Sequence, residues 1–251
     1  MNMKGIILAG GTGTRLYPIT KVINKHIVPI GDKPMIMHPL EKLTEANIKE
    51  ICIVSGPESL GDIIKFLGSG KDFNANLTYK VQDTANGIAG ALAVTEDFVK
   101  DEPIVVILGD NIFQESIREY VLDYSKNPRG ARIFVKEVND PERFGIAEIH
   151  KNEVINIIEK PKNPKSNLCV TGIYFYDKNV FDIIKTIKPS HREELEISGV
   201  NLEYLKRGEL SHYVLKKWWL DAGTFEALKE ANRLILESKA SRAKVEEMQG
   251  R

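Results

Sequence analysis

The sequence predicts an α/β fold with a mixed, mainly parallel sheet that is flanked by helices and extended by antiparallel strands. Short apolar runs alternate with segments of helical spacing in the first half of the chain. In the second half, strand-like runs follow one another with only short loops between them. Helical crossovers join parallel strands, whereas short loops join antiparallel strands, so the two halves are expected to extend one sheet in different ways.

In the first half, four runs rich in β-branched residues are too short for helices and are bounded by turn residues, which is typical of buried strands. These strands are predicted at Gly5–Ala9, Ile51–Ser55, Leu77–Gln82 and Ile104–Leu108. Helical spacing of apolar residues lies between them, over Met35–Ala46, Leu60–Leu67 and Ile88–Val99. Such an alternation covers both faces of a parallel sheet with helices.

The second half changes character. Strands are predicted at Ala131–Val138, Phe144–Ile149, Val154–Glu159 and Val170–Tyr176. Helical segments follow near Val180–Ile187 and Asn201–Lys206, then a strand at His212–Lys216 and a long charged amphipathic helix from Phe225 onward. Because no internal repeat, low-complexity tract or linker interrupts the chain, one continuous domain over residues 1–251 is the simplest organisation.

The composition excludes several functional classes. Lys and Arg total 35, as do Asp and Glu, so a formal net charge of zero offers no general attraction to nucleic acid or to a membrane. No apolar run approaches a membrane span, and we expect no signal peptide. Cys52 and Cys169 stand alone within apolar runs, which predicts core packing instead of a metal or redox motif. We therefore expect a cytoplasmic protein whose phosphate affinity is local.

A glycine-rich turn, Gly-Gly-Thr-Gly at residues 10–13, follows the first predicted strand. Glycines let backbone amides face a ligand without a Cβ in the way, which suits phosphate binding. Two common motifs do not fit, because a dinucleotide fingerprint needs glycine where Leu16 stands and a P-loop needs Gly-Lys-Ser/Thr where Thr14-Arg15 stands. The glycines alone leave a ligand site and a tight structural turn equally open.

Two basic residues close to this turn favour the ligand site. Arg15 ends the turn, and Lys25 follows shortly before Pro29. Transfer at the α-phosphorus of a nucleoside triphosphate builds negative charge on the departing pyrophosphate, which a guanidinium fork and an ammonium group can stabilise. In isolation, each residue would be interpreted as a solvated surface group.

Four segments together resemble the signature of the sugar nucleotidyltransferases. They are Gly10-Gly11-Thr12-Gly13-Thr14-Arg15-Leu16, Pro18-Ile19-Thr20, Asn24-Lys25 and Asp32-Lys33-Pro34-Met35-Ile36. Within this family the sequence is most similar to the glucose-1-phosphate thymidylyltransferases, from Lys4 to about Ala231. The resemblance implies one Rossmann-like domain, with a nucleotide-binding half at about 1–110, a sugar-binding half at about 111–235 and a C-terminal helix at 236–251.

The resemblance also implies which residues bind the nucleotide. The segment 81–89 is similar to the base-recognition segment of the family, in which the Gln82 amide can donate and accept toward a pyrimidine edge and Gly87 permits close backbone approach. Without the resemblance, Gln82 would be an ordinary polar strand end. Relatives often carry glutamine near Gly90, so the pocket is expected to differ there. The implied nucleotide-binding residues are Leu8, Gly10, Gly11, Thr12, Gly13, Thr14, Arg15, Gln82, Gly87 and Asp110, and the implied catalytic residues are Arg15, Lys25 and Asp110.

Asp110 ends an apolar strand, at the edge of an open α/β sheet where ligands gather. A carboxylate there suits a magnesium ion, although capping of a following helix is the alternative. The resemblance favours the metal and pairs Asp110 with Asp221 as ligands of Mg²⁺. The sequence does not show whether these two carboxylates meet.

By the same resemblance, the sugar phosphate is bound in the second half. The implied residues are Asn111, Gly145, Glu159, Lys160, Val170, Tyr174 and Arg192. Taken alone, the adjacent Glu159 and Lys160 would be a solvated pair at a strand end. The segment after Arg192 departs from the family pattern Arg-Gly-Glu-Leu-Glu-Ile-Thr-Asp, because Glu193 replaces the glycine and Gly199 replaces the aspartate.

The implied reaction joins dTTP to α-D-glucose 1-phosphate and gives dTDP-glucose and pyrophosphate. A general base is not expected, since the second pKa of a phosphomonoester is about 6 and the nucleophile is already ionised. A UTP-using or other hexose-1-phosphate enzyme is an alternative, because one methyl group in an apolar pocket is worth only about 1–3 kcal/mol. A non-catalytic nucleotide-sugar-binding regulator is a third, which Arg15, Lys25, Asp110 and Asp221 disfavour.

The family is commonly homo-oligomeric, so a dimer or tetramer is expected. The Trp218-Trp219 pair or the final helix could form an interface, and burial of the tryptophans within one chain is the alternative. Longer relatives carry a further helical segment that helps to frame a second nucleotide site. The sequence ends at Arg251, soon after the charged run Lys239–Glu247, so we expect no feedback control through such a site.

Overall fold

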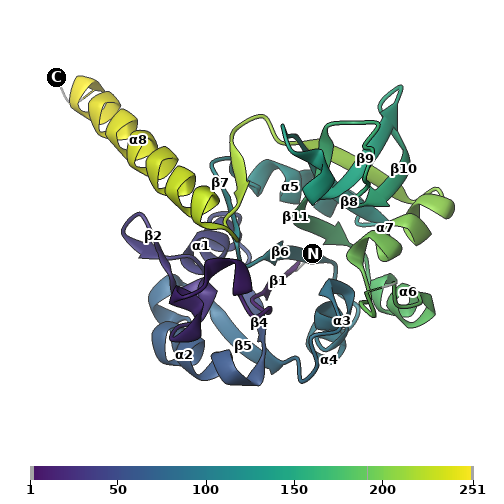
Figure 1. Ribbon diagram of the computed structural model, residues 1–251, viewed down its shortest axis with the longest axis horizontal. Helices are drawn as coiled ribbons and strands as arrows, with labels where there is room; N and C mark the ends of the chain where they lie inside the picture. Colours follow the sequence, from purple (N-terminus) through teal and green to yellow (C-terminus); the bar gives the residue numbers. More distant parts are fainter. Residues whose placement is uncertain (1–2, 191, 250–251) are drawn as a thin grey trace.

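The computed structural model describes residues 3–190 and 192–249. Four parallel strands form its first half: β1 (Lys4–Leu8), β4 (Glu50–Ser55), β5 (Asn76–Val81) and β6 (Ile104–Leu108). They lie in the spatial order β6-β1-β4-β5, with β1 between β4 and β6 (Figure 1). The predicted parallel half is confirmed.

The second half extends the same sheet with antiparallel strands. These are β8 (Ala131–Glu137), β9 (Gly145–His150), β10 (Glu153–Glu159) and β11 (Leu168–Tyr176). β11 runs antiparallel to β6 and so joins the two halves, which gives the order β10-β9-β11-β6-β1-β4-β5. β12 (Leu210–Val214) pairs with β8 in parallel and ends before Lys216, so the predicted range His212–Lys216 was two residues too late.

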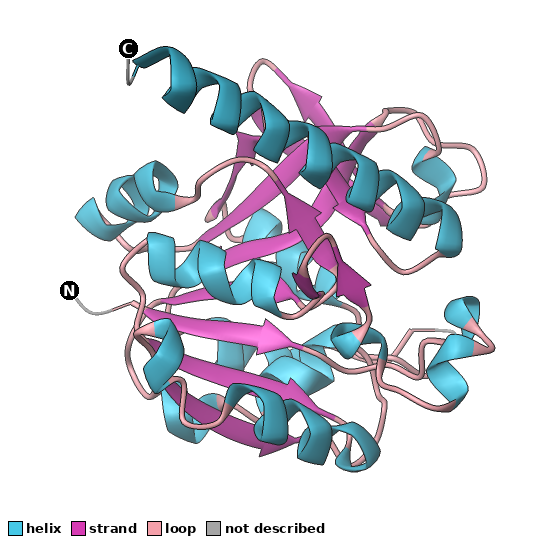
Figure 2. Cartoon of the chain, turned by 90° about the vertical axis from the view of Figure 1, so that its left-hand side faces the viewer, coloured by secondary structure: helices cyan, strands magenta, loops and turns pink. Residues whose placement is uncertain are grey.

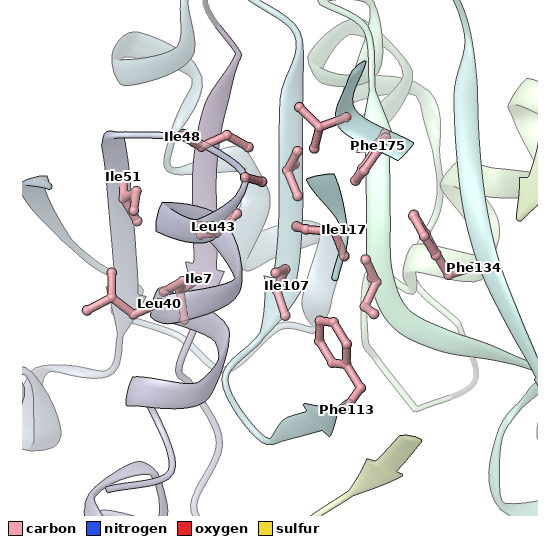
Figure 3. Close-up of a cluster of buried hydrophobic side chains, with 14 of the residues drawn as sticks. Ile7, Leu40, Leu43, Ile48, Ile51, Ile107, Phe113, Ile117, Phe134 and Phe175 are labelled. Carbon is pink, nitrogen blue, oxygen red and sulfur yellow. The ribbon is translucent and has the colours of Figure 1, made fainter. Parts of the chain in front are cut away.

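Helices cover both faces of the sheet. On one face lie α1 (Met37–Glu45), α2 (Pro57–Leu67) and α5 (Arg118–Lys126), and on the other lie α3 (Ile88–Ala93), α6 (Val180–Thr186) and α7 (Ile197–Lys206). Successive residues of a strand point to opposite faces, so Ile7 packs with Leu40 and Leu43 while Ile6 packs with Leu92. Figure 3 shows the first of these clusters, with Ile7 beside α1.

One helix prediction was wrong. The helix predicted over Ile88–Val99 is divided into α3 and α4 (Glu96–Val99). Between them the buried Thr95 hydroxyl donates to the Leu92 carbonyl at 2.7 Å, which ends α3. The alternative interpretation of Asp110 as a helix cap does not fit either, because Asp110 is followed by a strand, β7 (Asn111–Phe113).

The C-terminal segment packs on a third, smaller cluster. β13 (Trp219–Asp221) pairs antiparallel with β7, and β2 (Pro29–Ile30) pairs with β3 (Lys33–Pro34). α8 (Phe225–Gln249) places Leu228, Ala231 and Ile235 in this cluster. The far end of α8 extends beyond the rest of the fold (Figures 1 and 2). Residues 250–251 of the predicted C-terminal helix lie outside the described residues.

Short 3₁₀ turns complete the chain: η1 (Thr14–Leu16), η2 (Ile19–Lys21), η3 (Lys25–Ile27), η4 (Lys71–Phe73) and η5 (Pro141–Arg143).

Trp219 is 7% exposed and packs edge-on against Phe144, so it belongs to the core of the chain. Cys52 and Cys169 are both buried and unbridged, as predicted. Among the described residues, no helix combines the length and apolar character of a membrane span.

Candidate active site

One cavity of about 880 Å³ takes its lining from both halves of the chain. Most of the residues predicted to bind substrates line it: Leu8, Gly10, Gly11, Thr14, Arg15, Lys25, Gln82, Gly87, Asp110, Asn111, Gly145, Glu159, Lys160, Val170, Tyr174, Arg192 and Asp221. Thr12 and Gly13 are the two predicted residues outside this lining. The fold therefore brings residues from distant parts of the sequence to one place, while their roles stay predictions.

The glycine-rich turn follows β1 directly. Gly11 and Gly13 have φ angles of 92° and 63°, a region that L-residues with side chains rarely adopt. The Thr20 hydroxyl donates to the Gly13 carbonyl at 2.6 Å, and a Cβ on Gly13 would lie 3.0 Å from the Thr20 methyl group. Gly13 thus shapes the turn, whereas Gly10 and Gly11 face the cavity.

Asp110 and Asp221 are brought together by the short ribbon of β7 and β13. In its register, Asp221 lies opposite Asn111, the residue after Asp110. The Ala222 amide then donates to the Asp110 carbonyl at 2.9 Å. Both carboxylates consequently face the same cavity, across 110 residues of sequence.

A lysine neutralises the first of these carboxylates. Lys25 Nζ lies 2.6 Å from Asp110 Oδ2, and the two side chains are 12% and 11% exposed. Burial opposes ionisation of Asp110, but the charge of Lys25, together with hydrogen bonds from Lys25 and Asn111, outweighs it and holds the pKa of this carboxyl well below its usual range. Asp110 is therefore ionised at neutral pH.

The second carboxylate is in a less favourable environment. Burial, and then the charge of Asp110, raise the pKa of Asp221 above its usual value. Arg15 opposes this shift from 3.7 Å, with a side chain that is 55% exposed. A Cβ on Gly223 would lie 2.6 Å from the Arg15 guanidinium, so the glycine makes room for this approach.

Asn111 connects the carboxylates to the sheet. Its Nδ2 donates to Asp110 Oδ1 at 3.2 Å. Its Oδ1 accepts from the Gly172 amide at 2.8 Å and from Trp219 Nε1 at 2.7 Å. Asn111 was predicted as a sugar-phosphate ligand. The structure shows in addition that it positions Asp110, because both of its polar atoms are engaged with the protein.

Gln82 directly follows β5 and lines the cavity. Its Nε2 donates to Asn86 Oδ1 at 2.9 Å and to the Gly87 carbonyl at 3.2 Å. Both amide hydrogens are thus used within the protein. The sequence suggested that this amide could both donate to a base and accept from it. In the structure only Oε1 remains for a base, and it can only accept a hydrogen bond.

Glu159 is the last residue of β10, the edge strand of the sheet, and Lys160 follows it. Burial, and then the charge of Glu196, raise the pKa of Glu159. A Cβ on Gly145 would lie 3.1 Å from Glu159 Oε2, so these two residues share one surface of the cavity. Lys160 has a φ of 42°, an unfavourable backbone conformation of the kind that concentrates at functional sites.

Arg192 is surrounded by carboxylates. Its guanidinium lies 2.6 Å from Glu196, 3.5 Å from Glu194 and 3.6 Å from Glu159. A sugar phosphate would have to compete with these glutamates for it. The altered loop keeps a glycine-like conformation, since Glu193 has a φ of 60°. The structure does not require glycine at position 199, because a Cβ there would contact only Ile187, at an ordinary distance of 3.9 Å.

A model of the nucleotidyl transferase family matches residues 4–238. The chain belongs to this family. The family expected from the glycine-rich turn and its neighbouring segments is therefore confirmed, together with the enzyme class and the fold.

Relatives of this nucleotidyltransferase carry more specific names. The glucose-1-phosphate thymidylyltransferase of Neisseria meningitidis is 44% identical over 237 residues, which are 93% of this chain and 82% of that protein. A Bacillus anthracis protein, provisionally named glucose-1-phosphate thymidylyltransferase and solved with sucrose, is 55% identical, with a TM-score of 0.89 over 92% of this chain and 94% of that one. A UDP-glucose pyrophosphorylase solved with UDP-glucose is 28% identical, with a TM-score of 0.83 over 95% and 100% of the two chains.

The cavity of this nucleotidyltransferase contains polar residues that the sequence did not reveal. Asn201 is fully buried, its Oδ1 accepts from the Tyr176 hydroxyl at 2.7 Å, and its Nδ2 has no hydrogen-bond partner within residues 3–190 and 192–249. Ser198 and Glu196 line the same wall. A helical asparagine has no sequence signal for ligand binding, and only the packing of α7 against the sheet shows that it reaches the cavity.

His26 is a further residue near the site that the sequence did not reveal. Its ring is 1% exposed, and burial, followed by the charge of Lys25, lowers the pKa to about 3. A Cβ on Gly109 would lie 2.6 Å from this ring, so the ring packs directly under the residue before Asp110. A neutral imidazole there supports the strand end without adding charge to the site.

Proposed function

We propose that the protein transfers a thymidylyl group from dTTP to α-D-glucose 1-phosphate, giving dTDP-glucose and pyrophosphate. The named relatives support this proposal, since the Neisseria protein is a glucose-1-phosphate thymidylyltransferase at 44% identity. The observation that carries it is that both halves of the chain line one cavity: Arg15, Lys25 and Gln82 come from the half that we assign to the nucleotide, and Glu159 and Lys160 from the half that we assign to the sugar.

A divalent cation, which we propose to be Mg²⁺, fits the pair Asp110 and Asp221. Burial, and then the nearby charge of Asp110, raise the pKa of Asp221, so a cation between the two carboxylates would offset the cost of ionising both. Magnesium prefers carboxylate oxygens supplemented by substrate phosphates, so two protein ligands suffice. When bound, the cation supplies charge neutralisation between two anionic substrates.

The residues of the chain then perform the reaction by positioning and by electrostatic stabilisation. A phosphate oxygen of glucose 1-phosphate forms a bond to the α-phosphorus of dTTP, and the bond to the β-phosphate oxygen breaks, so pyrophosphate leaves with that electron pair. We assign Lys160 to the sugar phosphate, and Arg15 and Lys25 to the departing pyrophosphate. No residue needs to remove a proton, since the attacking phosphate is a dianion near neutral pH, its second pKa being about 6.

UTP is the alternative nucleotide. A UDP-glucose pyrophosphorylase shares the fold at 28% identity, and the acceptor that Gln82 presents suits uracil as well as thymine. Catalysis in the cytoplasm and assembly into a homo-oligomer, dimer or tetramer, are further parts of the proposal that rest on the family resemblance. Light scattering of the purified chain tests the assembly.

The function is tested by pyrophosphate release from paired substrates. The protein is incubated with Mg²⁺, one of dTTP or UTP, and one of several hexose 1-phosphates, and products are identified by mass. The highest kcat/KM is expected for dTTP with glucose 1-phosphate. Turnover with UTP only would favour the alternative nucleotide, and absence of turnover with every pair would contradict an enzymatic function.

A further inference from the structure

Gln82 and Asn86 form an amide pair at the nucleotide side of the cavity. Gln82 Nε2 lies 2.9 Å from Asn86 Oδ1 and 3.2 Å from the Gly87 carbonyl oxygen. A backbone carbonyl can only accept a hydrogen bond, so the Gln82 atom that faces it must be the nitrogen. The orientation of this amide therefore follows from its neighbours, although amide oxygen and nitrogen have nearly the same shape.

The remaining polar atom of Gln82 is an acceptor. Gln82 lines the cavity, and a Cβ on Gly10, which also lines it, would lie 3.3 Å from Gln82 Oε1. Within the described part of the chain, no donor is bonded to this oxygen. The Gln82 side chain therefore offers a ligand an acceptor and no donor.

Gly90 provides the space that Asn86 needs. Gly90 is buried on α3, and a Cβ built on it would lie 1.9 Å from Asn86 Oδ1 and 2.5 Å from Asn86 Cγ. A contact this short is excluded, so any larger residue would displace the Asn86 side chain. The glycine and the asparagine form one unit, and that unit holds the Gln82 amide.

We propose that Asn86, seated over Gly90, is a positioning residue that fixes Gln82 as an acceptor and so selects pyrimidine nucleotides carrying N3–H over cytidine nucleotides. The inference rests on the nucleotidyl-transfer function proposed above. N3 of thymine and uracil donates a hydrogen bond, whereas N3 of cytosine accepts one. Turning the Gln82 amide to suit cytosine would set its oxygen against two other acceptors, Asn86 Oδ1 and the Gly87 carbonyl.

The test measures the dissociation constants of dTTP and dCTP for the full chain by equilibrium titration, without sugar phosphate. Asn86→Ala removes one of the two acceptors that hold the amide, so the preference for dTTP should fall about three- to tenfold. Gly90→Ala displaces Asn86 and should lower the preference by a similar factor. The double variant should match Asn86→Ala alone, because both substitutions act through one contact.

Two controls separate orientation from general damage. Asn86→Asp keeps an acceptor oxygen and should retain the preference for dTTP. Thr84→Ala is an exposed change in the same loop and should leave both dissociation constants unaltered. Melting temperatures show whether each variant is folded, and Asn86→Ala alone decides the matter should Gly90→Ala not fold.

The inference is overturned by an unchanged ratio of the two dissociation constants in folded Asn86→Ala. Equal binding of dTTP and dCTP by the unsubstituted chain, or no binding of either, would overturn it as well. Selective binding of dTTP without pyrophosphate release from any substrate pair has a different meaning. In that case the proposed function fails, and the role of Asn86 in selecting the base stands.

Discussion

Lys25 and Asp110 form a nearly buried ion pair, with Nζ 2.6 Å from Oδ2. The pair joins a residue predicted to stabilise pyrophosphate with a residue predicted to hold a cation. In the chain without ligands, each satisfies the charge of the other at the wall of the cavity. The same pair therefore maintains the site and supports the fold, and the two contributions can be separated by comparing Lys25 with Arg15.

Lys25→Ala and Arg15→Ala are expected to lower kcat similarly and to differ in stability. Loss of one preorganised transition-state donor costs about 10²–10³ in rate. Lys25→Ala also leaves Asp110 buried without its partner, and breaking a buried pair costs about 3–5 kcal/mol of unfolding free energy. The Arg15 side chain is 55% exposed, so its removal should leave stability unaltered. Steady-state kinetics and urea unfolding measure both quantities.

A rise in the KM for nucleotide at constant kcat would contradict this assignment. The two residues would then be uniform binding groups, which act equally on the ground state and the transition state.

Asp110→Asn and Asp221→Asn are each expected to remove most cation-dependent turnover while the chain remains folded. An amide oxygen is a weaker ligand for a hard cation than a carboxylate, and two protein ligands leave no substitute. The measurement is pyrophosphate release over a range of Mg²⁺ concentrations, with circular dichroism to verify the fold. Near-normal activity of either variant at low Mg²⁺ would exclude that residue as a principal ligand.

Asp221→Asn is further expected to raise the melting temperature at neutral pH. Burial and the charge of Asp110 raise the pKa of Asp221 in the folded state, so the ionised carboxylate costs stability above that folded pKa. As pH falls through the folded pKa the group takes up a proton, and below its unfolded pKa the cost has vanished. The difference between variant and unsubstituted chain should therefore shrink with acidification. A constant difference across pH 4–8, at about the same ionic strength, would contradict this origin.

The sequence predicted the fold well where local patterns are strong. The β-branched runs at Ile51–Ser55 and Ile104–Leu108 are strands, because burial on both sides of a parallel sheet selects such runs. The ribbon of β7 and β13 was not predicted, since each strand has three residues and pairs with a segment about a hundred residues away. That ribbon brings Asp221 to Asp110.

Other features of the site depend on packing alone. The sequence does not determine which way the Gln82 amide points. Its orientation follows from the positions of Asn86 and Gly87 in the fold. Of the carboxylates around Arg192, Glu194 and Glu196 are its neighbours in the sequence, whereas Glu159 reaches it only because the loop approaches the end of β10, which no local pattern indicates. Residue types were thus easier to predict than the hydrogen bonds that give them their roles.

Glu193→Gly is expected to stabilise the protein by up to about 1 kcal/mol, because a left-handed conformation strains an L-residue and glycine offsets part of the gain through its flexible unfolded state. Glu193 has a φ of 60° in the altered loop beside Arg192. Thermal unfolding measures the change. Glu193→Ala, which keeps the strain, is the matched control and should not stabilise. Equal stability of the glycine and alanine variants would show that the loop relaxes in solution.

Glu159→Ala and Lys160→Ala are expected to impair the use of glucose 1-phosphate far more than the binding of nucleotide. Both residues line the side of the cavity formed by the second half, and Glu159 is held in place there beside Gly145. Glu159→Ala removes an acceptor for a sugar hydroxyl, and Lys160→Ala removes a cation that binds the sugar phosphate. In each variant kcat/KM for the sugar phosphate should fall by about 10²-fold or more. Nucleotide affinity, measured by titration without sugar phosphate, should change less than about threefold, since side chains remote from the nucleotide contribute little to its binding.

Lys162→Ala removes an exposed lysine from the same loop and controls for general loss of positive charge. Equal weakening of nucleotide binding and sugar-phosphate use would contradict the division of the cavity between the two substrates.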